Sequence, residues 1–451
     1  MNKVWRAPVA LSIVLAMATA ACSSDDTSSA SSSGSGSTLE VAPDELTEGG
    51  AWEAPGIEIS ANDLECGTTA ENPERGITAD SVRVGGLVTM SGPTTALYGD
   101  TDAGARARFD RANAEGGVHG RTIDYVGAED DGLEPSRQVD AARRLVEEEV
   151  FAVVPVQTTV PAWTDVFCEA VVPAFGWGTT PAWCNTTIGF GITGCLTNPD
   201  LTYNSQGIGP FVELLEGTDN TVAMIGIDSE NARLGMTRFT ETFERAGVDV
   251  VYGENILSAA EPIVDPSPVV NEIMTSNDGG PPAMVYQVID FANTSAITQG
   301  LVASGYEGKL VNAVGYDPRL AGFEGFQGSF TTLQWAPFEA TDVDFVAQMN
   351  ADFDEYAPEL NRGLPAAAGY IAADMFLTAL EDVGPDLTVD SFLETLNGGW
   401  VYSTPGFRGD AKFPENHVLG VPCSGVVQLQ DGEFSAATPI VCGRPYAREG
   451  G

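Results

Sequence analysis

The chain has 451 residues, of which 43% are hydrophobic and 8% aromatic, enough for a large core and roughly two to three domains. Lys and Arg total 21 against 64 Asp and Glu, so the formal net charge is −43. Such a surface repels nucleic acid and anionic lipid, which excludes a nucleic-acid partner. The acids are scattered rather than massed in one tail, which favours a solvated surface over a dedicated acidic binding face.

The N-terminus has the composition of an export signal. Two basic residues precede an apolar run at 9–17 that is too short for a stable membrane span, and small residues lead to Cys22. We expect residues 1–21 to be removed, which deletes two basic residues and no acids and gives a net charge of −43 − 2 = −45. Ala20-Ala21-Cys22 resembles a bacterial lipobox, so lipid on Cys22 is expected to anchor the chain to the outer face of the bacterial cytoplasmic membrane. The alternative is an ordinary signal cleaved nearby.

A tether is expected between this anchor and the folded part, over residues 22–72. Residues 23–37 are rich in Ser, Gly and Asp and lack apolar periodicity, which is typical of a flexible linker. Residues 38–72 are acidic and contain Pro, and they are expected to run extended over the surface.

Cysteine usage favours disulfides over a metal. Six cysteines remain after Cys22, and an even number in an exported chain favours pairing. No Cys-x-x-Cys occurs and the two histidines, His119 and His417, lie far apart, so we expect neither a zinc site, nor a redox site, nor a cofactor. The expected pairs are Cys184–Cys195, which closes a loop of 195 − 184 = 11 positions, Cys423–Cys442, which crosses a terminal hairpin, and, by elimination, Cys66–Cys168.

Residues 82–93 read as a buried strand that runs straight into a turn. Apolar, partly β-branched residues are followed by Ser91-Gly92-Pro93, which breaks the strand. A helix follows, with Ala105, Phe109 and Ala112 at i, i+4 and i+7 on one buried face, and a second strand is expected at 122–126. In open α/β sheets ligands bind at the carboxyl ends of the strands, so this turn is a candidate binding segment. The alternative is an ordinary tight turn.

Strands and helices go on alternating along the chain, which predicts parallel sheets with right-handed crossovers in two similar halves. The first half adds strands at 151–156 and 171–175, helices at 135–146 and 162–170, and an irregular loop at 184–195. The second half contains strands at 221–227, 249–252, 284–288, 309–314 and 329–335, a helix ending near 246 and another at 294–304. Helices around 345–353 and at 366–380 follow, and 418–441 alternates like an antiparallel hairpin that turns at Asp431-Gly432.

The order and spacing of several short motifs resemble the start of type I periplasmic binding proteins of the branched-chain amino-acid kind. The matching residues are Ser91-Gly92-Pro93, Tyr98-Gly99-Asp100, the run 112–120, Asp130-Asp131, Pro135 and Leu145-Val146, and weaker likeness extends to about Cys442. The resemblance implies two Rossmann-like α/β lobes with parallel sheets, joined by a three-stranded hinge, with a ligand cleft between them. It implies a first lobe from 73–203 and 337–400, and a second lobe from 204–336 and 401–451.

Polar or small residues follow the expected parallel strands in both lobes. Because the carboxyl ends of parallel strands lie along one edge of a sheet, two facing edges would line a cleft. Hydroxyls, backbone N–H groups of small residues and an aromatic wall suit a small polar ligand, whereas for any single residue ordinary loop polarity is the alternative. The candidate ligand-binding residues are Ser91, Tyr98, Thr158, Thr159, Trp177, Gly178, Thr179, Thr180, Asp228, Asp290, Tyr316 and Asp317.

The resemblance also suggests what these residues would hold, and where the chain departs. In the similar proteins, hydroxyls and N–H groups at positions matching Tyr98, Thr158-Thr159 and 177–180 hold the ligand carboxylate. Amino-acid binders place a Glu in the turn that corresponds to 314–317, where it meets the ammonium, whereas this chain offers Gly315-Tyr316-Asp317. The usual Tyr-Gly is Leu234-Gly235 here. A branched-chain amino acid is therefore in doubt, and amides, urea-like solutes and aromatic acids remain open.

Signatures of catalysis are weak. Residues 189–194 match a dinucleotide fingerprint only formally, because no convincing strand precedes them and no helix follows. No Gly-x-Ser-x-Gly elbow occurs, and no catalytic residue is assigned. We therefore expect a monomeric solute-binding lipoprotein that hands a small-molecule ligand to the membrane permease of an ABC importer. The alternatives are a ligand sensor of the same fold that signals to a membrane receptor, and an enzyme.

Overall fold

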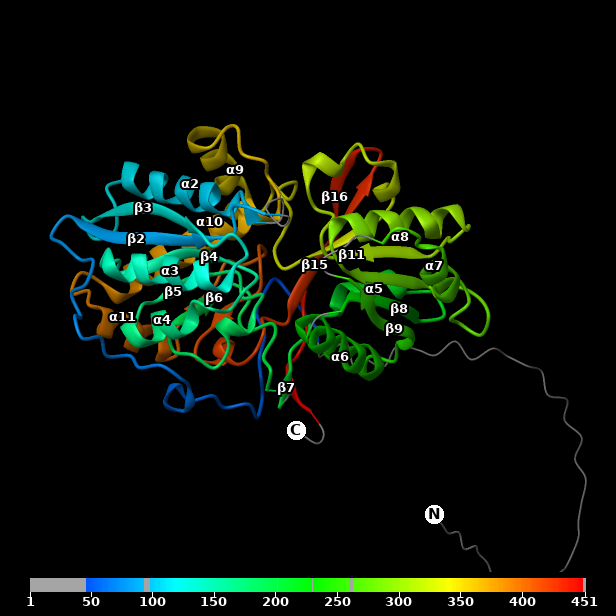
Figure 1. Ribbon diagram of the computed structural model, residues 1–451, viewed down its shortest axis with the longest axis horizontal. Helices are drawn as coiled ribbons and strands as arrows, with labels where there is room; N and C mark the ends of the chain where they lie inside the picture. Colours follow the sequence, from blue (N-terminus) through cyan, green and yellow to red (C-terminus); the bar gives the residue numbers. More distant parts are fainter. Residues whose placement is uncertain (1–45, 93–97, 201, 229, 259–262, 449–451) are drawn as a thin grey trace, which may run out of the picture. The chain divides into compact units, whose positions relative to one another are not determined.

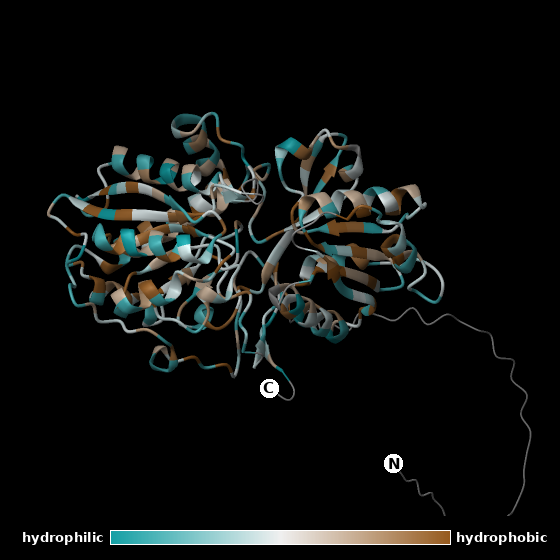
Figure 2. Cartoon of the chain, in the orientation of Figure 1, coloured by the Kyte–Doolittle hydropathy of each residue, from teal (hydrophilic) through white to brown (hydrophobic). Residues whose placement is uncertain are grey.

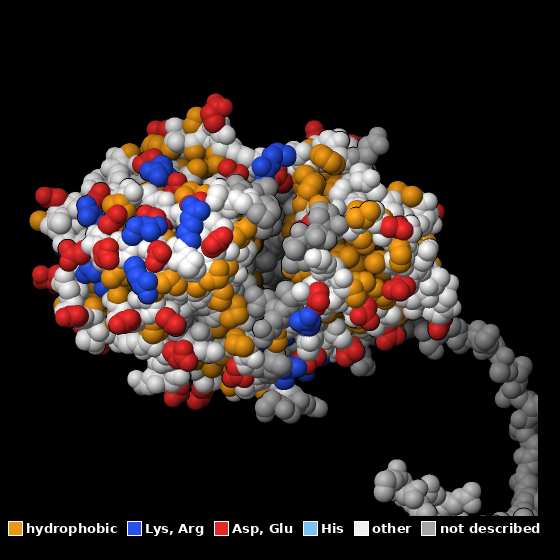
Figure 3. Space-filling view, in the orientation of Figure 1, with side chains coloured by type: hydrophobic (Ala, Val, Ile, Leu, Met, Phe, Trp, Pro, Cys, Tyr) orange, Lys and Arg blue, Asp and Glu red, His pale blue; other side chains and the backbone are white. Residues whose placement is uncertain are grey.

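The computed structural model describes residues 46–92, 98–200, 202–228, 230–258 and 263–448. The expected signal at 1–21, the lipid site at Cys22 and the tether up to residue 45 lie outside these ranges, as do Pro93 and Ser229. Within them the chain forms two α/β lobes, each built on a sheet with a parallel core, as expected. Figure 2 shows hydrophobic residues gathered on the strands of both sheets, and Figure 3 shows acidic side chains scattered over the face in view.

The first lobe contains a five-stranded parallel sheet in the order β3-β2-β4-β5-β6. Its strands are β2 (Ser81–Val88), β3 (Thr122–Asp130), β4 (Ala152–Gln157), β5 (Ala174–Gly176) and β6 (Gly189–Gly191). Its helices are α2 (Thr101–Ala114), α3 (Pro135–Glu147), α4 (Thr164–Ala170), α9 (Asp344–Tyr356), α10 (Leu364–Val383) and α11 (Val389–Asn397). Figure 1 shows α2 and α10 together on one side of this sheet.

Both faces of this sheet are covered, which explains why its central strands β4 and β5 are buried along their whole length. On one face the Phe376 ring of α10 lies 6.2 Å from that of Phe151 and 5.4 Å from that of Phe175. On the other face α3 packs so closely that a Cβ on Gly85 would lie 2.5 Å from the Leu145 side chain. All four expected strands and both expected return helices of this lobe are confirmed, with shifted ends.

The second lobe contains an eight-stranded sheet in the order β1-β16-β15-β12-β11-β10-β8-β9. Its strands are β1 (Thr47–Glu48), β8 (Thr221–Ile227), β9 (Asp249–Leu257), β10 (Met284–Val288), β11 (Lys309–Asn312), β12 (Phe330–Leu333), β15 (Cys423–Gln430) and β16 (Glu433–Cys442). Its helices are α5 (Gly209–Leu215), α6 (Glu230–Arg245), α7 (Ser267–Met274) and α8 (Phe291–Ala303). The hairpin turns at Asp431-Gly432, both with positive φ, as expected for a two-residue hairpin turn.

Alternate side chains of the central strands separate two hydrophobic cores, one on each face of this sheet. Val222 and Met224 of β8 join the core under α5 and α6. Ala223 and Ile225 join the core under α7 and α8. Because successive side chains of a strand point to opposite faces, one strand packs against a helical layer on each side of the sheet.

The loop expected at 184–195 contains a fifth strand that the sequence did not reveal. β6 pairs in parallel with β5, and the Phe190 ring stacks on Phe175 at 5.0 Å. The signal was missed because Gly189-Phe190-Gly191 is too short and too rich in glycine to show a strand period. Two short strand pairs are separate from the large sheets. β7 (Tyr203–Asn204) pairs with β17 (Tyr446–Ala447), and β13 (Val401–Tyr402) pairs with β14 (Ala411–Lys412).

Two expected boundaries differ from the structure. Residues 401–420 pack with the first lobe rather than the second, because the Phe413 and His417 rings contact Phe190 at 5.0 and 5.2 Å. Residues 46–72 are not a free linker. β1 pairs with β16, and the Trp52 side chain is 2% exposed and donates its indole N–H to the Asp410 carbonyl at 2.7 Å.

All three expected disulfides are present. Cys66–Cys168 ties the N-terminal segment to the first lobe, Cys184–Cys195 closes the loop around β6, and Cys423–Cys442 joins register partners at the base of the hairpin. After β2 the chain passes between the lobes three times, from β6 to β8, from β12 to α9 and from η6 (Glu415–His417) to β15. These connections bring the strand ends of the two lobes toward one another.

Candidate functional site

A small pocket lies where turns from both lobes meet the start of a helix. Its volume is about 110 Å³. Trp177 and Thr179 follow β5, residues 313–317 follow β11, and Leu364 and Pro365 open α10. The full lining is Tyr98, Trp177, Thr179, Ala313, Val314, Tyr316, Asp317, Leu364 and Pro365.

A buried asparagine fixes the turn after β11. The Asn312 side chain is 1% exposed, and its Oδ1 accepts hydrogen bonds from the backbone N–H groups of Val314 at 3.1 Å and Gly315 at 2.6 Å. Its Nδ2 donates to the Phe330 carbonyl at 3.0 Å. A Cβ on Gly315 would lie 2.6 Å from Asn312 Oδ1, so the turn requires glycine there. One amide thus determines how the next residues face the pocket.

Tyr316 forms a rigid wall. Its side chain is 2% exposed. The Tyr316 hydroxyl donates to a Glu339 carboxylate oxygen at 2.7 Å, and the hydroxyl oxygen accepts from the Phe338 N–H at 2.7 Å. The ring stacks on Phe338 and meets Phe434 edge-on at 5.0 Å. Burial, and then the adjacent Glu339 carboxylate, raise the pKa of the Tyr316 phenol well above its usual value. The hydrogen-bonding capacity of this hydroxyl is thus directed away from a ligand.

Asp317 is the acid in the pocket lining, and protein donors surround it. Its Oδ1 accepts from the Arg319 backbone N–H at 2.8 Å, so Asp317 caps the start of the short helix η4 (Pro318–Leu320). The Arg319 Nε lies 2.9 and 3.0 Å from its two oxygens, and Arg319 Nη2 also donates to Oδ2. Asn361 Nδ2 lies 3.4 Å from both oxygens. The carboxylate is therefore neutralised within the wall.

The first-lobe side of the pocket presents Trp177 and Thr179. The Trp177 ring packs against Trp335 with centroids 5.3 Å apart. Among the described residues, no acceptor bonds the buried indole N–H of Trp177. Thr179 folds back on the same turn, its N–H donating to the Trp177 carbonyl at 2.7 Å. This wall, unlike the one from the second lobe, keeps a hydrogen-bond donor without a protein partner.

Tyr98 connects the pocket to a buried acid. Burial, and then the nearby Asp131 carboxylate, raise the pKa of the Tyr98 phenol to about 12, so it stays protonated and can donate. Asp131 is fully buried and accepts from the Thr89 hydroxyl and from Gln138 Nε2, both at 2.8 Å. Sequence reasoning placed Asp131 after a strand but gave it no role. Its position directly after β3 was the available signal.

Five more expected residues of the first lobe lie outside the pocket lining. Burial alone would raise the pKa of Asp130, but hydrogen bonds, including one from Ser91, lower it below its usual value. The Thr158 hydroxyl donates to the Val160 carbonyl at 3.0 Å. A Cβ on Gly178 would lie 1.8 Å from the Gly194 carbonyl oxygen, so Gly178 serves close packing. Thr180 is 3% exposed and, like Ser91, Thr158, Thr159 and Gly178, does not line the pocket.

Two expected acids of the second lobe lie elsewhere. Asp228 is exposed and forms an ion pair with Arg233. Asp290 begins α8, where its Oδ1 accepts from the Asn293 N–H at 3.1 Å. Asp290 thus caps α8, Asp228 pairs with Arg233, and neither side chain lines the pocket. In their place the structure brings in Ala313, Val314, Leu364 and Pro365.

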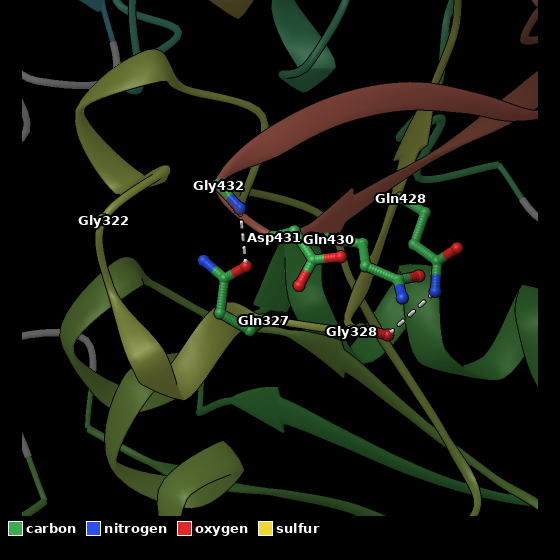
Figure 4. A pocket seen from close by; sticks show the side chains of 7 residues that line it. All are labelled: Gly322, Gln327, Gly328, Gln428, Gln430, Asp431 and Gly432. Carbon is green, nitrogen blue, oxygen red and sulfur yellow. Dashed lines mark hydrogen bonds between the residues drawn. The ribbon is translucent and has the colours of Figure 1, made fainter.

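A larger hollow of about 670 Å³ lies on the second lobe at the tip of the β15–β16 hairpin (Figure 4). Its lining is polar, and Gln327 Oε1 accepts from the Gly432 N–H at 3.0 Å while Gln428 Nε2 donates to the Gly328 carbonyl at 3.4 Å. Without an aromatic or apolar side chain in its lining, it offers a small solute little surface to bury. We therefore take the pocket between the strand ends as the candidate site. The larger hollow is lined by Gly322, Gln327, Gly328, Gln428, Gln430, Asp431 and Gly432.

Other kinds of site are missing from the part of the chain that the structure describes. That part holds no group of three or more His, Cys, Asp or Glu side chains arranged to bind a metal ion. None of its helices combines the length and the apolar character needed to cross a bilayer. The pocket itself, with strand-end turns on two α/β lobes, defines a protein that encloses a small solute.

Similarity to known proteins agrees with a protein that binds a solute. The model of the periplasmic binding protein family matches residues 81–433, so the chain belongs to that family. Its members bind solutes outside the cytoplasm, and the structural neighbours are substrate-binding proteins of ABC transporters. No curated protein sequence matches the chain.

Solved structures share the fold at low sequence identity. A leucine-binding protein from Thermotoga maritima has a TM-score of 0.62 and 17% identity, covering 80% of this chain and 98% of the other. A solute-binding protein from Rhodopseudomonas palustris in complex with benzoate has a TM-score of 0.60 and 17% identity, covering 82% and 98%. A fatty-acid substrate-binding protein from Thermomonospora curvata has a TM-score of 0.64 and 14% identity, covering 87% and 97%. At these sequence identities the likeness shows a shared fold, and the ligand has to be inferred from the pocket.

Proposed function

We propose that this protein is an extracytoplasmic solute-binding lipoprotein that captures a small ligand and delivers it to the permease of an ABC importer. One observation carries the proposal: turns at the carboxyl ends of strands β5 and β11, one in each lobe, line a single small pocket. Two lobes joined by three connections close by hinge motion in the handling of small solutes. The closed form docks on the permease, and the protein carries out no covalent chemistry.

The ligand-binding step is tested first. The full chain is exported from a bacterial host, purified and analysed by native mass spectrometry for a co-purifying solute. The solute should change tryptophan fluorescence, because Trp177 lines the pocket. A preparation that retains no solute and responds to none from a panel of amino acids, amides, urea analogues and aromatic acids would contradict solute binding.

Delivery is tested by uptake in living cells. Deleting the gene should abolish uptake of the identified solute, and the parent protein should restore uptake while Trp177→Ala should not. The alternative role, a sensor of the same fold, predicts intact uptake with loss of a transcriptional or behavioural response. The two outcomes separate an importer from a receptor partner.

The lipid anchor is tested separately. Each methylene of an acyl chain adds about 0.8 kcal/mol of membrane affinity, so a diacylated Cys22 would hold the folded part at the membrane. Cys22→Ser should release the protein into the medium in fractionation experiments. A Cys22→Ser protein that remains membrane-bound, with an unmodified mass, would contradict the anchor.

A further inference from the structure

We propose that the pocket selects small solutes that combine an aromatic or compact apolar body with a hydrogen-bonding head that is not an amine, and that the Asp317–Arg319 pair sets this selectivity. The inference rests on the proposed solute-binding function and deepens it by naming the ligand class. It follows from the size of the pocket, from the chemistry of its walls and from the bonding of its carboxylate.

Size and wall chemistry favour a compact apolar body. The lining contains three aromatic and four aliphatic side chains against one threonine and one aspartate. Its volume of about 110 Å³ is below that of a cavity of about 150 Å³ that holds a benzene molecule. The apolar body inside the pocket can therefore be no larger than about a single ring, with the head at the mouth, and a long acyl chain exceeds the pocket.

The pocket carboxylate has no remaining capacity for a ligand ammonium. An ionised carboxylate accepts about four hydrogen bonds. Asp317 already accepts from the Arg319 side chain at Nε and Nη2, from the Arg319 backbone N–H, and from Asn361 Nδ2. An incoming amine would have to displace the guanidinium of Arg319, which lies only two residues after Asp317 in the chain.

A second acid at the same place strengthens this arrangement. Burial raises the pKa of Asp100, the nearby Arg319 lowers it, and Asp317 raises it, so the three charges lie within reach of one another. Asp100 is not part of the pocket lining. Arg319 thus neutralises the one charged side chain that the described residues contribute to the pocket lining, the Asp317 carboxylate. The head of the ligand instead belongs on the first-lobe side, where the hydroxyl-bearing side chains of Tyr98 and Thr179 line the pocket.

Three probes of matched size test the proposal on the full purified chain by isothermal titration calorimetry. Benzoate, benzamide and benzylamine share one ring and differ in the charge of the head, and L-leucine adds an amino acid. We expect benzoate or benzamide to bind at least about tenfold more tightly than benzylamine or leucine. The better of the two accepted probes tells whether the head is an anion or a neutral amide.

Arg319→Gln sharpens the test, because it frees Asp317 to meet an ammonium. Charge-assisted hydrogen bonds are about twice as strong as neutral ones, so benzylamine should gain about tenfold in affinity relative to benzamide. Adding Asp317→Asn to the same chain should abolish that gain. Arg83→Gln removes an equal charge from the exposed Arg83–Asp124 pair, outside the pocket, and should leave the ranking of the probes unchanged.

Circular dichroism would reveal whether Arg319→Gln misfolds, and a second variant allows the test to be made in that case. Asn361→Ala removes one donor from Asp317 and should shift the ranking toward benzylamine by a smaller factor. The inference is overturned if benzylamine or leucine binds the parent most tightly, if no probe binds, or if folded Arg319→Gln keeps the parent ranking. A co-purifying solute with an ammonium group would overturn the ligand class while leaving the proposed function intact. A protein that retains no solute and supports no uptake would instead contradict the function itself.

Discussion

The two lobes build their halves of the pocket in opposite ways. The second lobe presents one turn in which each named polar group already has a protein partner: Asn312 bonds its own turn, the Tyr316 hydroxyl bonds Glu339, and Asp317 bonds Arg319. The first lobe presents Trp177, whose buried indole N–H meets no acceptor among the described residues, beside Thr179. A wall with satisfied polar groups contributes shape, whereas a wall with an unused donor contributes recognition. We infer that damage to the second-lobe wall reduces stability, and that damage to the first-lobe wall reduces binding.

The largest expected effect is on the second-lobe turn. Asn312→Ala leaves two buried backbone N–H groups and the Phe330 carbonyl without their partner, and each unsatisfied group costs about 1–3 kcal/mol. We expect the free energy of unfolding, measured by urea denaturation without ligand, to fall by about 3 kcal/mol. Asn271→Ala, on the exposed surface of α7, is the control and should change it by less than about 0.5 kcal/mol. A loss below 1 kcal/mol for Asn312→Ala would show that the turn is not fixed by this amide.

On the first-lobe wall, Trp177→Ala should act mainly on binding. Ligand at 100 times its dissociation constant stabilises a protein by about 2.7 kcal/mol, and we expect the variant to lose most of that gain. The unliganded protein should lose only about 1 kcal/mol, from the ring pair with Trp335. Thermal shift with and without the cognate solute separates the two effects. A solute that stabilises Trp177→Ala as strongly as the parent would place the site elsewhere.

A smaller effect is expected when Tyr316 loses only its hydroxyl. Tyr316→Phe removes the bonds to Glu339 and to the Phe338 N–H, and it should lower the free energy of unfolding by about 1–2 kcal/mol while leaving ligand affinity within about threefold. Tyr203→Phe, at a half-buried tyrosine outside the pocket, serves as the matched control. Should Tyr316→Phe abolish binding without loss of stability, the hydroxyl would be a ligand contact and the comparison of the walls would be wrong.

The smallest expected effect is a pH dependence at Glu339. Burial raises the pKa of this carboxyl above its ordinary value of 4.5, although the Tyr316 hydroxyl bond opposes the shift. A raised pKa in the folded state means that the folded protein binds the proton more tightly than the unfolded chain does. Glu339 therefore adds to the free energy of unfolding below pH 4.5, and this stabilisation is lost as the pH rises through the folded-state pKa. Urea denaturation of the parent relative to Glu339→Gln, at a series of pH values above 4.5, should show this decline. A difference between the two proteins that stays constant with pH would contradict the shift.

Much of the sheet architecture could be predicted because buried parallel strands are short apolar runs that end at turn residues. β10 was located at both of its ends, Met284 and Val288, by that signal. β6 was missed because its stability comes from the Phe190–Phe175 stack and the pairing with β5, neither of which is local in sequence. Residues 401–420 were placed in the wrong lobe for the same reason, since long-range packing decides their position.

The site was only partly predictable. Trp177, Thr179, Tyr316 and Asp317 could be found because they follow strands. Leu364 and Pro365 were missed because the expected helix began at 366, whereas Pro is compatible with the first turn of a helix and α10 begins at Leu364. The neutralisation of Asp317 was also hidden, because nothing in the order Asp317-Pro318-Arg319 shows that the guanidinium folds back onto the carboxylate.

The N-terminal segment adds a mechanical constraint to any motion of the lobes. β1 hydrogen-bonds to β16 of the second lobe, and Cys66 is covalently joined to Cys168 of the first, so residues 49–65 form a strap of fixed length with both ends attached. Along the way Gly50 lies against the backbone near Arg408, where an added Cβ would be 2.2 Å from the carbonyl oxygen. The strap is a fourth connection, beyond the three hinge crossings. The distance by which the lobes can separate is therefore limited by a piece of chain that precedes both of them, and cutting or reducing that piece would widen the opening without altering a single pocket residue.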